Sequence, residues 1–374
     1  MNLQKDEQAV LTLRGLYQRY GYAPYKMSRW EEYDLYVRNK DFLVSDQVIT
    51  FSDRSGRLLA LKPDVTLSII KNAPNSGEQV QKLYYNENVY RADKTSGTFK
   101  EIMQTGLECV GNIGACEIAE VVLLAAESLA QMGQNFVLDL SHMGLITQVL
   151  SESGLSAEEQ EEAALQLRQK NMHELKRLCD RAGCLPQVWD QLSALVGCSG
   201  SPADVIPDMR SRITGPSAEK ALAELETISR ILEAKGLADR IRIDFSVASD
   251  MKYYSGVVFK GYLEGIPAGI LSGGQYDKLL QKMGKQGGAI GFAIYLDMLE
   301  GLSENEQVFD VDTVLLHKAS DDPVAVIKVA EALRQSGQVL TATAMPADKT
   351  CRRVYAFERG EAVFLADNGE YSAT

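Results

Sequence analysis

Polar side chains that recur at even spacing on one predicted strand are the first candidates for binding chemistry. Gln104 and Glu108 lie in the segment 99–109, which has the pattern of a β-strand, so both face the same side of a sheet. An amide beside a carboxylate offers hydrogen-bond donors and acceptors to a small polar ligand. The adjacent Tyr253 and Tyr254 add two hydroxyl groups. Taken by themselves, these residues fit an ordinary polar strand face, so only their context can assign them a function.

The cysteines and histidines do not form a pattern that binds metal. None of the 6 cysteines belongs to a CxxC pair or has a histidine at ligand spacing. We therefore expect reduced and mostly buried thiols, no zinc or other metal, and no cofactor. His142, His173 and His317 lie in no recognisable motif, so each is expected to be structural or exposed.

The charge of the chain argues against nucleic acid as a partner. A formal net charge of -12 at pH 7 makes the average surface repel phosphate, so only a concentrated basic patch would bind it. The densest basic pairs, at 176–177 and 352–353, stand alone within segments of mixed charge. The apolar stretches are too short for a bilayer and the first residues lack a signal-peptide pattern, so we expect a cytoplasmic protein without a membrane partner.

The first part of the chain has the pattern of an α+β unit. Apolar spacing predicts helices over 6–19, 64–71 and 117–132. A hairpin is expected from 48–51 and 58–61, and a flexible turn at 94–97. Further strands are predicted over the ranges 79–85, 89–92, 99–109 and 136–140.

A change of composition marks an insertion. Residues 144–236 are rich in Ala, Leu, Glu, Gln and Arg and are interrupted by Gly and Pro, which predicts a helical insertion. Strand patterns resume at 241–247, 257–263, 270–277 and 287–294, with a tight bend expected at Gly273 and Gly274. Runs of adjacent strands with helices beside them indicate an antiparallel α+β sheet.

The last part of the chain predicts a separate small domain. A strand at 311–316, a helix at 323–335 and strands at 339–344 and 362–366 alternate as in a parallel α/β domain. We therefore expect one domain over 1–303, a boundary at 303–308, and a second domain over 308–374.

Six motifs, in this order along the chain, resemble those of the class II histidyl-tRNA synthetases. Residues 20–23 with 30–36 are similar to the first motif, which forms the dimer interface in class II enzymes, although Ser28 replaces a proline there. LKPDVT at 61–66 resembles the substrate-binding LRPEGT. The remaining matches are 89–93 with 97–108, 253–259, 273–277 and 288–294. The resemblance implies a class II synthetase-like antiparallel sheet with flanking helices, dimeric self-association, and a C-terminal α/β domain like a shortened anticodon-binding domain.

The chain departs from this family where positive charge would meet ATP. Activating an amino acid builds charge on phosphates, which preorganised cations stabilise, and losing one such donor costs roughly 3 kcal/mol. At positions where the family has an arginine or an acidic side chain, this chain has Thr98, Lys100, Ser249, Lys252, Gln275 and Met298. Four of these side chains are uncharged, and the two lysines are not equivalent to the residues that they replace. The resemblance therefore implies no catalytic residues and no adenylate formation.

The amino-acid pocket of the family, by contrast, is retained in the sequence. The resemblance implies that Asp64, Gln104 and Glu108 bind histidine, with Thr66 as a further hydroxyl and Tyr253 and Tyr254 against the ring. Asp64 is one carbon shorter than the family's glutamate. Arg91, which matches the second-motif arginine, is then expected to meet the carboxylate of histidine.

A retained pocket without the catalytic arginines is similar to the synthetase paralogues that regulate histidine biosynthesis. This resemblance implies a non-catalytic subunit that pairs with the short-form ATP phosphoribosyltransferase catalytic subunit in a hetero-octamer, with histidine as inhibitory effector. Two alternatives remain open. One is a divergent histidyl-tRNA synthetase, and the other is a pseudo-synthetase that senses tRNA.

Overall fold

The computed structural model describes residues 5–43, 48–74, 79–92, 97–248, 253–301 and 309–367. The chain divides into two compact units, the larger ending at Leu302 and the smaller beginning at Ser303. Each is described by itself. Of the described helices, none combines the length and apolar character that a bilayer crossing requires.

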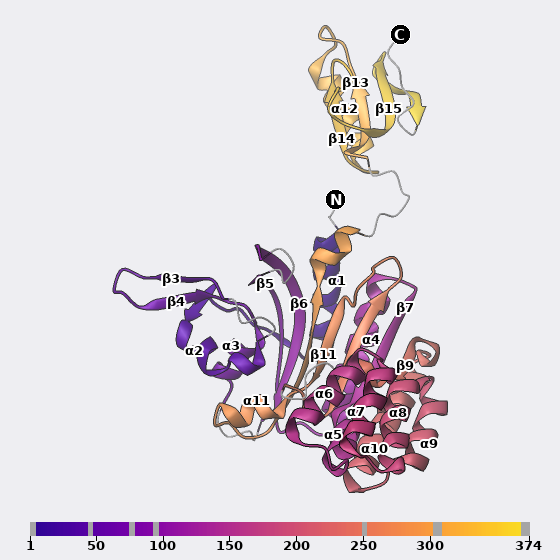
Figure 1. Ribbon diagram of the computed structural model, residues 1–374. Helices are drawn as coiled ribbons and strands as arrows, with labels where there is room; N and C mark the ends of the chain where they lie inside the picture. Colours follow the sequence, from indigo (N-terminus) through magenta and orange to yellow (C-terminus); the bar gives the residue numbers. More distant parts are fainter. Residues whose placement is uncertain are drawn as a thin grey trace. The chain divides into compact units, whose positions relative to one another are not determined.

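A nine-stranded sheet forms the centre of the larger unit as far as it is described (Figure 1). It is antiparallel from β5 through β6, β12, β11 and β10 to β7, whereas the outer pairs β1–β5 and β7–β9 are parallel. The antiparallel sheet predicted from the sequence is confirmed at its centre. In spatial order the strands are β1 Ala23–Pro24, β5 Gln81–Ala92, β6 Phe99–Gly111, β12 Gly288–Tyr295, β11 Leu271–Gln275, β10 Val257–Leu263, β7 Phe136–His142, β9 Ile241–Asp244 and β8 Ser199–Gly200.

Two strand predictions were wrong in their extent. The two strands predicted over 79–92 form one strand, β5, because the ladder with β6 continues through the polar residues 86–88. The strand predicted over 241–247 ends at Asp244, whose carboxylate accepts the backbone N–H of Ser246 at 3.0 Å and starts the 3-10 turn Phe245–Val247.

The bend predicted at Gly273 and Gly274 is absent, since both residues lie within β11. They are glycines because of close packing. A methyl group on Gly273 would lie 2.6 Å from the ring of Phe259, and one on Gly274 would lie 2.7 Å from the ring of Tyr254. Phe259 belongs to the main apolar core, and Tyr254 lines the pocket described below.

The two faces of the sheet carry different partners. Helix α1 (Lys5–Arg19) and helix α4 (Ala115–Met132), both predicted from apolar periodicity, pack with Leu107 and Cys109 of β6 in the main apolar core. Strand alternation turns Gln104 and Glu108 to the opposite face. On that face, a second core is formed with helix α3 (Thr66–Asn72) and helix α11 (Asp277–Lys282).

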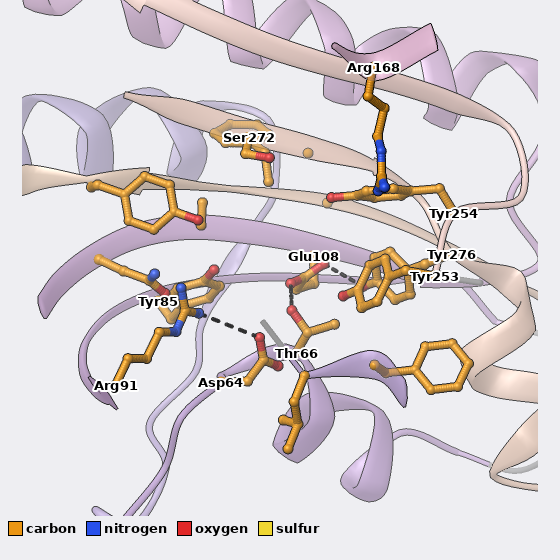
Figure 2. Close-up of a pocket in the computed structure, with 18 residues that line it drawn as sticks. Asp64, Thr66, Tyr85, Arg91, Glu108, Arg168, Tyr253, Tyr254, Ser272 and Tyr276 are labelled. Atoms are coloured by element: carbon orange, nitrogen blue, oxygen red, sulfur yellow. Dashed lines mark hydrogen bonds and ion pairs between the residues drawn. The ribbon is translucent and has the colours of Figure 1, made fainter. Parts of the chain in front are cut away.

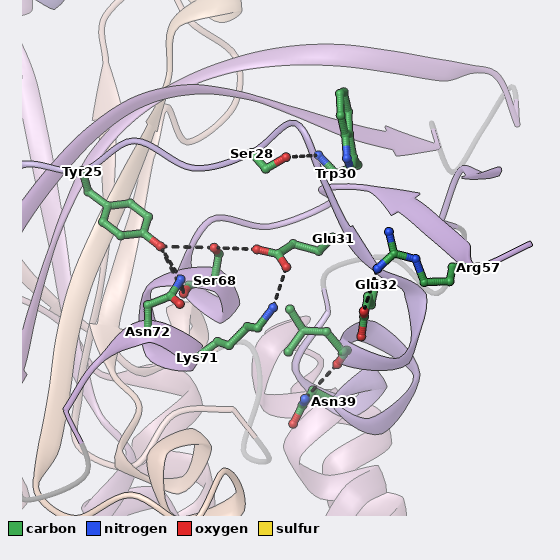
Figure 3. A network of polar contacts seen from close by, with 11 residues as sticks. Tyr25, Ser28, Trp30, Glu31, Glu32, Asn39, Arg57, Ser68, Lys71 and Asn72 are labelled. Atoms are coloured by element: carbon green, nitrogen blue, oxygen red, sulfur yellow. Dashed lines mark hydrogen bonds and ion pairs between the residues drawn. The ribbon is translucent and has the colours of Figure 1, made fainter. Parts of the chain in front are cut away.

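A small antiparallel sheet holds the start of α3 in place. It consists of β2 (Trp30–Glu32), β4 (Leu58–Leu61) and β3 (Thr50–Ser52), and helix α2 (Tyr33–Arg38) follows β2. Figure 3 shows Glu31 of β2 accepting hydrogen bonds from Ser68 at 3.2 Å and Lys71 at 2.7 Å on α3. The hydroxyl of Tyr25 reaches the Ser68 hydroxyl at 3.2 Å. Because α3 is tied to β2 in this way, the residues at its N-terminal end have a defined position.

The segment between β7 and β9 is helical apart from β8. Its helices are α5 Met143–Glu152, α6 Ala157–Arg168, α7 Met172–Ala182, α8 Pro186–Gly197, α9 Pro202–Arg212 and α10 Pro216–Ala234. His142 joins this insertion to the sheet. Its Nδ1 accepts the backbone N–H of Gly144 at 2.9 Å at the start of α5, and its Nε2 lies 3.3 Å from Glu224 of α10. This histidine is therefore structural, as expected.

The smaller unit contains a four-stranded sheet in the order β14-β13-β15-β16 with helix α12 (Pro323–Arg334) packed on it. The strands are β13 Val311–Leu316, β14 Val339–Ala342, β15 Cys351–Glu358 and β16 Glu361–Asp367. β13 pairs in parallel with β14 and β15, as the predicted parallel domain requires. The sequence interpretation missed β15, and β16 runs antiparallel to it.

Candidate ligand-binding site

A cavity of about 420 Å³ lies on the α3 face of the sheet, and all seven residues proposed from the sequence line it (Figure 2). Asp64 precedes α3 and Thr66 is its first residue, whereas Arg91 belongs to β5. Gln104 and Glu108 belong to β6, and Tyr253 and Tyr254 precede β10. Segments separated by about 190 residues in the chain thus meet in one pocket.

Glu108 lies at the centre of the cavity and is 2% exposed. The Thr66 hydroxyl donates to its Oε1 at 2.6 Å, and the Tyr276 hydroxyl donates to its Oε2. The pKa of Glu108 is raised to about 8, chiefly by burial and to a smaller extent by the charge of Asp64, while the two hydroxyl groups act in the opposite direction. The carboxyl group is therefore mostly protonated at neutral pH until a positive charge or further donors arrive.

Asp64 is the second carboxylate of the pocket. Its Oδ1 accepts the backbone N–H of Leu67 at 2.9 Å in the first turn of α3, and its Oδ2 lies 3.9 Å from Nη2 of Arg91. Burial raises the pKa of Asp64, whereas Arg91 and the backbone N–H groups oppose that rise. Arg91 is itself held by a 2.8 Å hydrogen bond from its Nε to the carbonyl of Pro63.

Gln104 presents a donor without an acceptor. Its side chain is 2% exposed, and its Nε2 has no hydrogen-bond partner among the described residues. A buried N–H without a partner costs roughly 1–3 kcal/mol, which an acceptor on a ligand would recover. The pocket thus presents a donor whose acceptor the described residues do not supply.

Tyrosine rings form one wall of the cavity. The ring centroids of Tyr253 and Tyr254 are 4.7 Å apart with an interplanar angle of 71°, and Tyr276 lies 5.7 Å from Tyr253. Burial raises the pKa of all three phenols well above 10, so they remain neutral hydrogen-bonding groups. These rings offer flat apolar surface to a planar ligand group.

Several lining residues were not singled out from the sequence. Tyr276 lies within the recognised motif at 273–277, so the motif could have indicated it. Tyr85 lies in β5 beside the second motif, and Phe42 and Leu43 come from the segment before β3. Arg168 belongs to the helical insertion, outside every motif, so no signal in the sequence marked it.

Several positions of the sequence depart from the synthetase pattern. Those that belong to the described residues supply no charge to the pocket. Met298 is partly buried against the main core. Gln275 donates to Asp277 at 2.7 Å. Thr98 and Lys100 are exposed. Ser249 and Lys252 lie outside the described residues, as do residues 94–96 of the predicted turn.

No metal site is found among the described residues. They contain no group of three or more histidine, cysteine, aspartate or glutamate side chains placed to hold an ion. All of the cysteines are free thiols, of which Cys109, Cys179 and Cys351 are buried.

Comparison with known proteins defines the class to which this fold and pocket belong. A sequence profile described as histidyl-tRNA synthetase matches residues 1–299. The chain therefore belongs to the histidyl-tRNA synthetase family, as its motifs predicted.

Within that family, the chain is similar to regulatory proteins. The ATP phosphoribosyltransferase regulatory subunit of Clostridium novyi (strain NT) is 30% identical over 337 residues, which cover 87% of this chain and 79% of the relative. A solved structure from Bacillus halodurans, described as an ATP phosphoribosyltransferase regulatory subunit/histidyl-tRNA synthetase, is 24% identical with a TM-score of 0.75, over 92% of this chain and 90% of that one. A chain of the ATP phosphoribosyl transferase (HisG:HisZ) complex from Thermotoga maritima has a TM-score of 0.62 at 19% identity, over 78% of this chain and 97% of that one. These similarities confirm the synthetase-like fold.

Proposed function

We propose that this chain is the non-catalytic regulatory subunit of an ATP phosphoribosyltransferase and that histidine is the ligand of its pocket. The name of the Clostridium novyi relative supports the regulatory role. The shared fold with a chain of the Thermotoga maritima complex supports a catalytic subunit as the partner. We propose the short-form catalytic subunit and a hetero-octamer that contains this chain as a dimer.

The observation that carries the proposal is the set of buried polar groups in the tyrosine-walled cavity. Histidine brings an ammonium group, an imidazole N–H, an imidazole acceptor nitrogen and a carboxylate. Asp64 and Glu108 offer acceptors to the N–H groups, and the unpaired Nε2 of Gln104 offers a donor to an acceptor. The rings of Tyr253 and Tyr254 then lie against the imidazole. Asp64, Glu108 and the Nε2 of Gln104 thus each find a counterpart on this amino acid.

The same pocket is poorly suited to ATP chemistry. Among its described lining residues, Arg91 and Arg168 carry the positive charge, and Arg91 is already directed at Asp64. A triphosphate with its metal ion needs several preorganised cations in the transition state. The uncharged Met298, packed against the core, replaces the arginine expected to cover adenine. We therefore propose that the chain binds an amino acid without activating it.

Regulation requires that histidine distinguish two states of the complex. A ligand shifts an equilibrium only by its difference in affinity for the two states, and typical couplings are about 1–3 kcal/mol. We propose that the ligand-free chain activates the catalytic subunit and that the histidine-bound chain inhibits it.

The test is reconstitution with a short-form catalytic subunit. Phosphoribosyl transfer to ATP is measured for the catalytic subunit alone, with this chain, and with this chain and rising histidine. We expect stimulation, followed by inhibition as histidine increases. Glu108→Gln should keep the stimulation and lose the response to histidine. The matched control is Glu101→Gln, on the same strand, where the carboxylate is exposed and bonds to Asn88 and Tyr90.

Three outcomes would contradict the proposal. The regulatory role is wrong if this chain neither stimulates the catalytic subunit nor makes it sensitive to histidine. Histidine-dependent exchange of pyrophosphate into ATP would instead show a divergent synthetase. Salt-sensitive binding of tRNA at submicromolar concentration, without any effect on the transferase, would show a tRNA sensor.

A further inference from the structure

Two thiol groups meet where helix α7 of the insertion ends. Cys179 lies near the end of α7, and Cys184 lies in the connection that leads to α8. Cys179 belongs to the main apolar core, and Cys184 packs against it. Both are free thiols, and the two thiol groups are hydrogen-bonded to each other. Cys198, by contrast, donates its S–H to the carboxylate of Asp208 at 3.1 Å.

The backbone of this turn brings the two cysteines together. Gly183 ends α7 in the left-handed conformation, with φ 69° and ψ 34°. The backbone N–H groups of Gly183 and Cys184 both donate to the carbonyl of Cys179, the second at 2.9 Å. In helix ends of this kind, the side chain that follows the glycine folds back onto the last turns of the helix. Because glycine adopts the left-handed conformation without steric penalty, the turn holds the two sulfur atoms in contact.

The two thiols differ in their access to solvent. Cys179 is 2% exposed, whereas Cys184 is partly exposed. Burial, and to a smaller extent the neighbouring Cys184, raises the pKa of the Cys179 thiol. Since the thiolate is the reactive form, Cys184 is the thiol that a reagent from solution meets first. Cys179 is placed to react second, with whatever has been attached to Cys184.

We propose that Cys179 and Cys184 form a site of reversible thiol–disulfide exchange, with a low-molecular-weight disulfide as the oxidant. In the first step, the Cys184 thiolate attacks one sulfur of the oxidant, whose S–S bond breaks. One half of the oxidant stays on Cys184, and the other half leaves as a thiolate that takes up the proton lost by Cys184.

The second step closes the bond within the chain. Cys179 loses its proton and attacks the sulfur of Cys184, so the second half of the oxidant leaves and becomes a thiol. Two thiols of the chain are thus oxidised to one disulfide, and one small disulfide is reduced to two thiols. Because Cys179 already touches Cys184, this step is intramolecular and should outrun any competing attack from solution. The site is independent of the ligand that occupies the tyrosine-walled cavity.

The experiment treats the full chain with an excess of oxidised glutathione and locates the products by mass spectrometry of its peptides. In the unaltered chain we expect a bond between Cys179 and Cys184, seen as the loss of two hydrogen atoms and reversed by dithiothreitol. Cys179→Ala removes the second thiol, so glutathione should remain on Cys184 at a level at least about 10-fold above that in the unaltered chain. Cys184→Ala should leave Cys179 reduced. Cys116 on α4 is an exposed thiol and serves as the internal control, since it should carry glutathione in all three proteins.

The unaltered chain decides the central point, so the test does not depend on how well the variants fold. The inference is wrong if glutathione reaches Cys116 while Cys179 and Cys184 both stay reduced. It is equally wrong if glutathione stays on Cys184 of the unaltered chain, or if Cys184 pairs with Cys198 instead. The proposed function is tested separately, because this assay contains neither histidine nor a catalytic subunit.

Discussion

Histidine should displace a proton from Glu108 when it binds. The pKa of this carboxyl group is raised to about 8, chiefly by burial, against an ordinary value of 4.5. At pH 7, a group with that pKa is protonated in about nine molecules out of ten. Because the N–H groups of histidine favour the ionised carboxylate, binding at pH 7 should release up to about 0.9 proton from Glu108.

The number of protons can be measured by calorimetry at pH 7 in buffers that differ in enthalpy of ionisation. The slope of observed enthalpy against buffer enthalpy gives the protons released. Glu108→Gln removes the titrating group and keeps a side chain of similar shape, so any remaining histidine binding should show a slope near zero. The affinity of the unaltered chain should also rise with pH between 6 and 8, because less work is then needed to ionise Glu108. An equal slope in the two proteins would refute the assignment of the proton to Glu108.

Three further perturbations test the pocket. The folded state binds the Glu108 proton more tightly than the unfolded state, so its stability contribution is complete below pH 4.5 and is lost as pH rises to 8. At about 1.36 kcal/mol per pH unit, the loss between pH 5 and pH 8 is about 3–4 kcal/mol, and urea unfolding at these two pH values should show it in the unaltered chain and not in Glu108→Gln. Gly291→Ala places a methyl group against the Glu108 carboxylate and the Leu107 carbonyl, so calorimetry should find no histidine binding and urea unfolding a loss of about 1–3 kcal/mol. Gly15→Ala, where the added methyl group would have no described atom within 4 Å apart from its chain neighbours and the backbone of its own helix, is its control. Gln104→Met removes a buried unpaired donor, so it should raise the free energy of unfolding by about 1 kcal/mol while weakening histidine, and unchanged histidine affinity would contradict the role of its Nε2.

Local patterns in the sequence predicted much of the fold. The helices α1 and α4 and the strand β10 appear within a few residues of their predicted ends, because apolar periodicity depends on neighbouring residues. Strand β15 was missed, and β5 was split at residues 86–88, where polar side chains interrupt the pattern but the ladder to β6 continues. The glycine pair in β11 was interpreted as a bend because its true cause, the ring of Tyr254 beside it, is not a local feature.

The seven proposed site residues could be selected from the sequence because they belong to recognisable motifs. Arg168 could not, since the insertion that carries it has no motif and reaches the pocket through the packing of α6 on the core. Tyr276 lay within a motif, but its bond to Glu108 joins β6 to the start of α11 across a large separation in the chain.

The amino-acid sequence by itself determined the order and type of most elements, the family to which the chain belongs, and the identity of the buried acceptors. Only the tertiary structure decided that Glu108 has a raised pKa, that the Gln104 amide lacks a partner, and that two arginines face the cavity from opposite sides. The physical reason is that helix and strand periods depend on residues a few positions apart. Desolvation and charge pairing depend on which distant segments meet.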